Sequence, residues 1–321
     1  MLIQSLNFKL NDKKEFIVSS EASSVTAILV TFNPEPNIFH KVINSLSSQI
    51  QNIIVVDNSS KNRKEFEFFL NQQNGIILLP QENNIGLAAA QNIGIKYAKD
   101  ILNSTHIILF DQDSIIEPNF VVNLINEELK LKHEGYKIAA IGPSFYDPEN
   151  NKVYPATLYC GPFIRKVMLA EQPVEATFLI ASGCLINMDV IKHIGYMLED
   201  LFIDYIDVEW SLRAKKSGYK LFITPKSSMA HSIGDKRISF FGRTISCHSP
   251  LRRYYLVRNS FKMMRLPYVP IGYKIRETIF NILRVIIGFA TSTDKKSFTK
   301  YTVVAFKDGV SGKFGPCKYK F

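Results

Sequence analysis

Two aspartates separated by one residue follow an apolar run in the first half of the chain. The run His106–Phe110 has the composition of a buried strand, and Asp111 and Asp113 come directly after it. At this spacing both carboxylates can reach one divalent cation, and hard cations such as Mg²⁺ combine carboxylate oxygens with phosphate oxygens. The pattern predicts a metal-bridged phosphate site, although the same pair at a strand end is also common turn chemistry.

A second acidic cluster contains Asp204, Asp207 and Glu209, followed by Trp210 and Arg213. Three carboxylates this close repel one another, and Arg213 can pair with Glu209 because they are four residues apart on a predicted helix. A carboxylate left over beside a metal-phosphate site is a candidate general base. The alternative is a structural role, because a carboxylate at a helix start is also a natural cap and a lone tryptophan suits a core.

Further polar residues follow other predicted strands. Thr31 and Asn33 lie in the first such loop, and Asp57 ends the second strand, where it can accept hydrogen bonds from a nucleoside or cap the next helix. His231 ends a later β-type run. A lone histidine is more often structural than a ligand, but histidine is also a common metal ligand.

Small residues gather at another predicted helix start, in the segment 84–94 that contains Asn84, Gly86 and Asn92. Small side chains let a backbone approach a ligand, and a helix N-terminus attracts phosphate. Close packing of the helix on the sheet explains the same residues equally well. The spacing does not match the GxGxxG pattern, so a dinucleotide fingerprint is absent.

The elements that must position these residues alternate between strand and helix. The predicted strands are 25–31, 53–56, 75–79, 106–110 and 138–141, and the predicted helices are 36–48, 61–72, 85–99 and 117–132. Such alternation with short connections indicates an α/β fold with a parallel sheet and helices on both faces. Because ligands bind at the carboxyl ends of the strands in such sheets, the polar residues above are expected to converge there.

The pattern loosens after residue 143. Residues 144–180 have the composition of hairpins and loops, and helices are predicted over 188–195 and 207–217. After His231 the chain is basic and helical, with 248–264 and 273–290 as its longest predicted helices. We place a soft domain boundary near residue 240.

The charge balance favours an anionic partner. The chain has 39 Lys and Arg against 29 Asp and Glu, a net charge of +10, and most of the excess lies in 237–321. Nucleic acid, an anionic membrane and a phosphorylated substrate are the candidate classes. A nucleic-acid-binding protein would interleave basic and aromatic residues on one face, whereas the candidate site here is acidic, so nucleic acid is not expected as a partner.

No segment reaches the roughly 18 to 20 apolar residues that span a bilayer. The polar N-terminus lacks a secretory signal, and four widely spaced cysteines without a CxxC pair indicate reduced thiols in a cytoplasmic protein. The segment 271–290 mixes Lys274, Arg276 and Arg284 with apolar residues, as an interfacial amphipathic helix would. The alternative is that these apolar residues pack on the preceding domain or in a homo-oligomer interface.

The motifs taken in order resemble the family 2 glycosyltransferases of the GT-A fold. Within that family the chain is most similar to the bacterial rhamnosyltransferases of surface-polysaccharide assembly, over about residues 25–260. The motifs that carry the resemblance are Val25–Asn33, Ile54–Ser59, Asn84–Gly86, Asn92–Gly94, Phe110–Asp113, Ser182–Gly183, Asp204–Trp210, His231 and Arg253–Asn259. It implies a Rossmann-like, mostly parallel sheet flanked by helices, with a helical basic C-terminal region.

The resemblance also implies roles for single residues. Asp207 matches the family's catalytic base, with Asp204 as the alternative because Ile206 stands where the wider family has a glutamate. Asp113, Asp111 and His231 would hold Mg²⁺ or Mn²⁺. The nucleotide-sugar contacts would come from Thr31, Asn33, Asp57, Asn84, Gly86, Asn92 and Asp111, and the acceptor side from Glu209 and Trp210.

The implied activity is an inverting, metal-dependent transfer of L-rhamnose from dTDP-L-rhamnose to a hydroxyl of a lipid-linked glycan, at the inner face of the membrane. Residues 1–240 would form the catalytic domain, with nucleotide-sugar binding in about 25–143 and the acceptor side in about 144–240. The region 241–321 would contact membrane or a second copy. Alternatives are a UDP- or GDP-sugar donor, a sugar nucleotidyltransferase, or a non-catalytic protein that binds anionic ligands. A nucleotidyltransferase would usually carry a glycine- and basic-rich loop, which Thr31–Glu35 lacks.

Overall fold

The computed structural model describes residues 24–147, 152–230, 237–240, 243–246 and 249–321. Its centre is a mixed sheet that has eight strands within these residues, in the order β3-β2-β1-β4-β9-β5-β10-β8. The strands are β1 (Val25–Thr31), β2 (Asn52–Asp57), β3 (Ile76–Pro80), β4 (His106–Asp111), β5 (Ile138–Tyr146), β8 (Val174–Ala176), β9 (Cys184–Asn187) and β10 (Lys220–Ala230). The predicted α/β class with a mostly parallel sheet is confirmed.

The first four strands pair in parallel, and their register sets up the functional edge. Thr31 at the end of β1 lies opposite Asp57 on β2, and Val30 lies opposite Asp111 on β4. The continuous runs of Ile, Val and Leu in β1, β2 and β4 are buried, as expected for strands covered on both faces. The carboxyl ends of these three strands therefore meet at one edge of the sheet.

Strand β9 was not predicted. It has only four residues, pairs antiparallel with β4 and β5, and separates two strands that the alternating pattern places next to each other. Because it runs the opposite way, its start lies at the edge where β4 ends, and the N–H of Gly183 donates to the carbonyl of Leu109 at 2.7 Å. The Ser182–Gly183 pair thereby joins the functional edge.

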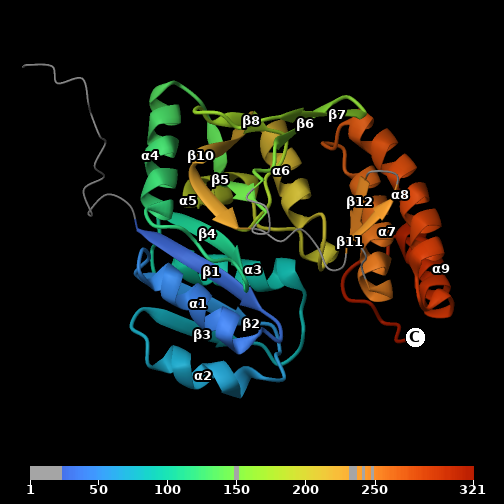
Figure 1. Ribbon diagram of the computed structural model, residues 1–321, viewed down its shortest axis with the longest axis horizontal. Helices are drawn as coiled ribbons and strands as arrows, with labels where there is room; N and C mark the ends of the chain where they lie inside the picture. Colours follow the sequence, from blue (N-terminus) through green and yellow to red (C-terminus); the bar gives the residue numbers. More distant parts are fainter. Residues whose placement is uncertain (1–23, 148–151, 231–236, 241–242, 247–248) are drawn as a thin grey trace, which may run out of the picture.

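Helices cover both faces of the sheet (Figure 1). Those on one face share a core with it: α1 (Pro36–Ser47), α2 (Arg63–Asn71) and α4 (Phe120–His133). Those on the other face share a second core: α3 (Leu87–Asp100), α5 (Met188–Ile194) and α6 (Ile206–Lys216). The prediction of helices on both faces is correct, although α2, α3 and α4 each begin two or three residues later than predicted.

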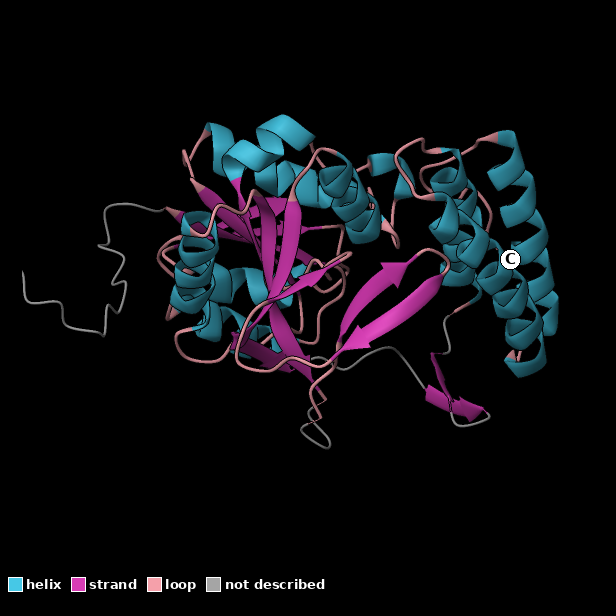
Figure 2. Cartoon of the chain, turned by 90° about the horizontal axis from the view of Figure 1, so that it is seen from above, coloured by secondary structure: helices cyan, strands magenta, loops and turns pink. Residues whose placement is uncertain are grey.

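The C-terminal region contains α7 (Pro250–Arg265), α8 (Ile271–Thr291) and α9 (Lys295–Ser311), of which α9 was not predicted. Figure 2 shows these three helices gathered beside the sheet and its flanking helices. The hairpin of β11 (Arg237–Phe240) and β12 (Arg243–Ser246) precedes them, so the predicted boundary near residue 240 falls at this hairpin. No helix among the described residues is long and apolar enough to cross a bilayer.

A second hairpin reaches the C-terminal helices from the sheet side. It consists of β6 (Ala156–Cys160) and β7 (Phe163–Val167), in the region predicted to form hairpins. Its turn packs on the start of α8 so closely that a Cβ at Gly272 would lie 2.3 Å from the backbone of Gly161. The guanidinium of Arg276 lies 4.1 Å from the centre of the Tyr159 ring. Helix α8 is thus fixed against the β6–β7 hairpin.

Candidate active site

A cleft of about 720 Å³ opens at the edge where β1, β2 and β4 end. The loop before α6 and the start of α7 close its other side. Six residues predicted for the site line it: Asn84, Gly86, Asp111, Asp113, Asp204 and Asp207. Segments that are far apart in sequence therefore bring four aspartates into one cleft.

The loop after β4 is held by its main chain and by the residue between its aspartates. The side-chain oxygen of Gln112 accepts a hydrogen bond from the Phe32 N–H at 2.8 Å, which ties the loop to the end of β1. The N–H of Asp111 donates to Ser182 Oγ at 3.1 Å. These contacts fix the loop while the Asp111 and Asp113 side chains line the cleft.

The electrostatics around Asp111 disfavour its charged form. Burial, followed by the negative charges of Asp113 and Asp207, raises the pKa of Asp111 to about 6, and the guanidinium of Arg252 acts in the opposite direction. A carboxylate under this repulsion would be relieved by a bound cation. The pair Asp111 and Asp113 therefore fits a divalent metal in charge and donor type.

Asp207 lies in the first turn of α6, and its Oδ1 accepts the N–H of Val208 at 2.8 Å. Burial is the main cause that raises the pKa of Asp207 to about 6, and the nearby charge of Asp204 acts in the same direction. Asp204 differs in having a cation partner, because Arg252 donates to its Oδ1 from two nitrogens at 3.2 and 3.3 Å. Of the two base candidates, Asp207 is the one beside main-chain donors rather than a guanidinium.

The loop before α6 has an unusual backbone. Phe202, Asp204 and Tyr205 all have φ near +64°, a left-handed conformation that costs energy for residues other than glycine. Helix α7 holds this conformation from behind: the fully buried Asn259 donates from Nδ2 to the carbonyls of Leu201 and Ile203, both at 2.8 Å. Strain at a cleft held by a buried amide is typical of a functional loop.

Arg258 supports the same loop from the neighbouring position on α7. This fully buried guanidinium donates to the carbonyls of Leu201, at 3.3 Å, and Asp200, at 3.4 Å. The sequence motif Arg253–Asn259 was assigned to the resemblance without a role, and Arg252 was counted only with the basic tail. Contacts to main-chain carbonyls leave no residue pattern, so the sequence held no signal for them.

The start of α3 differs from its prediction. The N–H groups of Leu87 and Ala88 donate to the carbonyl of Phe202 at 2.7 and 3.4 Å, so this helix N-terminus is capped by the loop before α6. These bonds favour the alternative of close packing for this helix start, and phosphate binding there stays a prediction. Gly86 has φ +89°, and a Cβ there would lie 2.6 Å from the Phe202 ring. The glycine is required by this close packing.

Asn84 also has a structural task. Its Oδ1 accepts hydrogen bonds from the Gly86 N–H at 3.0 Å and from Asn58 Nδ2 at 3.1 Å. The Asn58 Oδ1 in turn accepts from the Ile85 N–H at 2.9 Å. Asn58 is itself a cleft residue that was not predicted, although it lies within the Ile54–Ser59 motif.

Thr31, Asn33 and Asp57 are not among the residues that line the cleft. Asp57 is fully buried and accepts hydrogen bonds from Thr31 Oγ1 at 3.2 Å and from the Ser60 N–H. Asn33 fixes the same loop by accepting the Lys61 N–H at 2.8 Å. Their neighbours Phe32 and Asn58 line the cleft instead, and the alternative that Asp57 caps α2 is wrong because Asn62 holds that position. A direct nucleoside contact from Asp57 stays a prediction.

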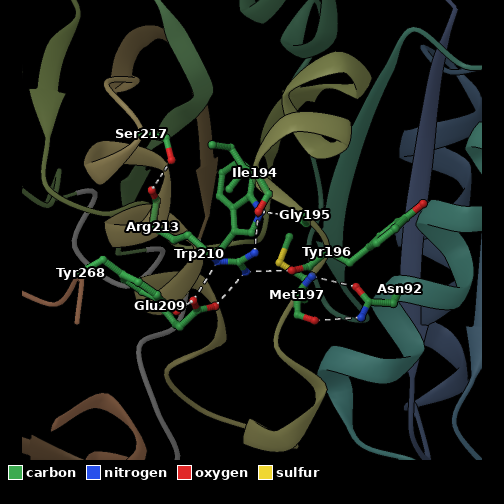
Figure 3. Close-up of polar contacts among 10 residues, drawn as sticks. All are labelled: Asn92, Ile194, Gly195, Tyr196, Met197, Glu209, Trp210, Arg213, Ser217 and Tyr268. Carbon is green, nitrogen blue, oxygen red and sulfur yellow. Dashed lines mark hydrogen bonds and ion pairs between the residues drawn. The ribbon is translucent and has the colours of Figure 1, made fainter. Parts of the chain in front are cut away.

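Asn92 is not a cleft residue. Its side chain makes two hydrogen bonds of 2.9 Å with the main chain of Met197, one from Nδ2 to the carbonyl and one from the N–H to Oδ1 (Figure 3). A third bond, at 2.8 Å, joins its Nδ2 to Glu199. Because the amide is fully used and buried, its predicted place in the nucleotide pocket is corrected to a structural one.

Glu209 and Trp210 are likewise core residues rather than acceptor contacts. Glu209 is fully buried and accepts from Arg213 Nε at 2.9 Å and from the Tyr268 hydroxyl (Figure 3). The indole of Trp210 donates to the Gly195 carbonyl at 3.0 Å. The predicted Glu209–Arg213 pair is confirmed, and it explains why this carboxylate is not free for the cleft.

The predicted metal ligand His231 lies outside the described residues. Strand β10 ends just before it, and Met229 forms an isolated bridge with Ile116, three residues beyond Asp113. Within the part of the chain that the structure describes, no group of three His, Cys, Asp or Glu side chains is arranged to hold a metal ion.

Sequence comparisons identify relatives of this chain. The family model described as "Glycosyl transferase family 2" matches residues 26–195. A dTDP-rhamnosyl transferase, RfbF of Shigella flexneri, is 35% identical over 300 residues, which cover 92% of this chain and 99% of that protein. A low-salt glycan biosynthesis hexosyltransferase, Agl10 of Haloferax volcanii, is 24% identical over 61% of this chain and 63% of that protein.

Solved structures share the fold at low identity. GalNAc-T7, determined with UDP, GalNAc and Mn²⁺, is 16% identical with a TM-score of 0.57, over 91% of this chain and 58% of that one. The mannosyltransferase PcManGT of Pyrobaculum calidifontis, determined with GDP-Man and Mn²⁺, is 12% identical with a TM-score of 0.55, over 92% and 89%. The chain therefore belongs to glycosyltransferase family 2, has the GT-A fold and is a glycosyltransferase of the rhamnosyltransferase-like type.

Proposed function

We propose that this glycosyltransferase transfers L-rhamnose from dTDP-L-rhamnose to a hydroxyl of a lipid-linked glycan, with inversion at the anomeric carbon, in bacterial surface-polysaccharide synthesis. The relative from Shigella flexneri supports the donor, because it is named for dTDP-rhamnose and matches over nearly its whole length. The observation that carries the reaction is the Asp207 carboxylate in a cleft that also holds Asp111 and Asp113.

Asp207 is the general base in this proposal. Its pKa of about 6 leaves it ionised near neutral pH and basic enough to take the proton of an attacking hydroxyl. The hydroxyl oxygen attacks the anomeric carbon from the face opposite the nucleotide, so the configuration inverts without a covalent enzyme intermediate. Asp204 keeps the Arg252 guanidinium in place, which favours a positioning role for it.

Asp111 and Asp113, together with His231, would hold Mg²⁺ or Mn²⁺ in this proposal. When bound, the metal supplies positive charge that stabilises the departing nucleoside diphosphate. The residues of the chain fit this role because burial and like charges raise the pKa of Asp111, a strain that a cation removes. The two GT-A structures above, each determined with Mn²⁺, are consistent with a divalent ion.

The acceptor and location are part of the same proposal. A lipid-linked glycan would present its hydroxyl near a bilayer, and the net charge of +10 favours an anionic surface. We therefore place the enzyme in the cytoplasm, peripherally on the inner face of the membrane.

Donor binding is the first test. The purified chain would be titrated by calorimetry with dTDP-L-rhamnose, UDP-sugars and GDP-sugars, each with Mg²⁺, Mn²⁺ or EDTA. We expect metal-dependent preference for dTDP-L-rhamnose, and loss of this binding in Asp113→Ala. Preference for a UDP- or GDP-sugar would remove the rhamnose assignment, whereas no binding to any donor would contradict the proposed activity.

The base assignment has its own test. Asp207→Asn should keep donor affinity and lose about 10² to 10⁴-fold in turnover, because the amide cannot accept the proton. The matched variant Asp204→Asn removes a carboxylate from the same cleft and should lose much less. A reversed order of the two losses would assign the base to Asp204, and wild-type turnover in Asp207→Asn would exclude it as the base.

A further inference from the structure

Helix α8 is amphipathic in the reverse of the usual sense, because its apolar side faces outward. Within the residues described, Thr278 is the one polar side chain among its exposed positions. The exposed large apolar residues are Ile271, Ile275, Ile279, Phe280, Ile282, Leu283, Ile286 and Phe289. Ile286, for example, is 60% exposed. A surface helix normally buries its apolar stripe, so this face needs a cover.

The inner side of α8 is polar and fixed in place. The buried carboxylate of Glu277 accepts hydrogen bonds from the Tyr205 hydroxyl and from Arg284. Asn281, also buried, donates to the hydroxyl of Ser260 on α7. Rotating α8 to bury its apolar face would break the Glu277–Arg284 ion pair and the hydrogen bonds of the buried Glu277 and Asn281, which is unfavourable. The outward apolar face is therefore a stable feature of the fold.

Helix α9 extends the same surface. It packs beside α8, and the two helices form the outer edge of the molecule (Figures 1 and 2). Val303, Phe306 and Val310 are exposed on it, Val310 to 65%. We call these residues, with the exposed apolar residues of α8, the outer face. Exposed apolar side chains on two neighbouring helices, rather than single scattered ones, indicate an interaction surface.

The charged residues around the outer face indicate what kind of surface can cover it. Lys296, Lys300 and Lys307 are exposed on α9. Among the described residues after 265, Asp294 is the one exposed acidic side chain, because Glu277 and Asp308 are buried. A second copy of this face would bring lysines against lysines, whereas anionic lipid headgroups complement them.

We propose that the outer face of α8 and α9 lies in the headgroup region of a bilayer that contains anionic phospholipids. The apolar side chains enter the interface and the lysines of α9 contact lipid phosphates. Arg276 and Arg284, which the sequence assigned to this contact, instead face Tyr159 and Glu277. The inference deepens the membrane association proposed above and rests on it, while donor binding is independent of it.

The experiment is flotation of the full-length protein with vesicles of phosphatidylcholine, with and without about one third phosphatidylglycerol. We expect binding to the anionic vesicles that weakens with salt. The double variant Ile279→Glu/Ile286→Glu should bind at least about tenfold more weakly, because two charges replace inserted apolar side chains. Phe68→Glu is the matched control: Phe68 is 73% exposed on α2, away from the outer face, and this variant should bind like the wild type.

A triple variant separates the electrostatic part. Lys296→Gln, Lys300→Gln and Lys307→Gln together should weaken binding to anionic vesicles by about 10²-fold, because each lysine near the surface contributes roughly 1 kcal/mol. Binding of this variant equal to that of the wild type would overturn the choice of anionic lipid.

Other outcomes are equally decisive. Wild-type protein that stays off anionic vesicles overturns the proposal. So does a dimer in analytical ultracentrifugation that Ile279→Glu/Ile286→Glu converts to a monomer without any vesicle binding, because the cover is then a second copy. Calorimetry with dTDP-L-rhamnose on the same preparations distinguishes the failures: retained donor binding limits the failure to the membrane surface, and lost donor binding removes the proposed function.

Discussion

Asp207 lies in the first turn of α6, where the helix dipole and the Val208 N–H favour a carboxylate, yet burial raises its pKa to about 6. Burial therefore opposes the charged form of the Asp207 carboxyl, while the helix dipole and the Val208 N–H favour it. Such a balance is expected of a base and not of a structural cap, whose pKa would fall. It also has a consequence for folding stability, since an unfolded aspartate ionises near 3.8.

Asp207→Asn should make the metal-free protein more stable above pH 6. Between pH 3.8 and about 6 the folded wild type holds a proton that the unfolded chain releases, so its stability falls as pH rises through this window. The amide carries no such penalty. We expect the variant and the wild type to differ little at pH 4 by urea unfolding in EDTA. At pH 8 the variant should gain roughly 3 kcal/mol, which is what a pKa raised from 3.8 to about 6 corresponds to.

The opposite sign, with Asp207→Asn less stable at pH 8, would contradict the raised pKa. The same measurement serves the kinetic test, because a stable variant that lacks turnover has lost chemistry and not its fold.

The sequence could predict which single residues at motif positions belong to the site. It could not predict the residues, such as Asn259, whose side chains bind main-chain carbonyls of the loop before α6. Asp111, Asp113 and Asp207 were predicted and meet in the cleft because each is a carboxylate at a strand or helix end. Glu209 is also a carboxylate and lies two residues after Asp207, but its oxygens are bonded to Arg213 and Tyr268 in the core. Sequence alone could give the Glu209–Arg213 spacing, but not that the pair lies buried.

At the level of elements, the functional edge of the sheet depends on two features that the sequence did not predict. One is strand β9, and the other is the contact of helix α7 with the loop before α6. The first four strands were predicted because long apolar runs alternate with amphipathic helices. The four residues of β9 are too few to be distinguished from a loop by their pattern. They form a strand because they pair with both β4 and β5, which lie on either side of them. Helix α7 was predicted as a helix, but its contact with the loop before α6 is long-range and has no local pattern.

The α7 contact predicts that Asn259→Ala damages the loop before α6, which leads into the base Asp207. Removing the amide leaves the carbonyls of Leu201 and Ile203 without their donor, and the left-handed residues of the loop lose the support that holds them. We expect a loss of about 1 to 3 kcal/mol in unfolding free energy, together with a fall in turnover that exceeds the change in donor affinity.

Asn123→Ala is the control for this variant. Asn123 on α4 also donates from Nδ2 to a main-chain carbonyl, that of Lys226 at 2.8 Å, but lies away from the loop. It should leave turnover near the wild-type value. Equal kinetic losses in both variants would show that Asn259 acts only through general stability, and unchanged turnover in Asn259→Ala would remove its positioning role.

For the whole molecule, the C-terminal helices are part of the catalytic unit although they follow a predicted boundary. Met263 of α7 and Tyr273 of α8 belong to the same core as β4 and α6, and Glu277 of α8 binds the hydroxyl of Tyr205 in the cleft loop. A composition shift after residue 240 marks the change to basic helices. Composition alone does not show that these helices share a hydrophobic core with the sheet. A membrane contact at the outer face would therefore lie one helix away from the loop before α6, which Asp207 follows directly.

This shared core predicts one cooperative unfolding transition. Trp210, the only tryptophan, reports on α6, and far-UV circular dichroism reports on all helices, α7 to α9 included. Because both regions share buried contacts, the two signals should give the same urea midpoint. Glu277→Ala removes the buried carboxylate that both Arg284 and Tyr205 bind, and should lower both midpoints together. Loss of helix signal in that variant before any change in Trp210 fluorescence would contradict the prediction and make α7 to α9 a separate folding unit.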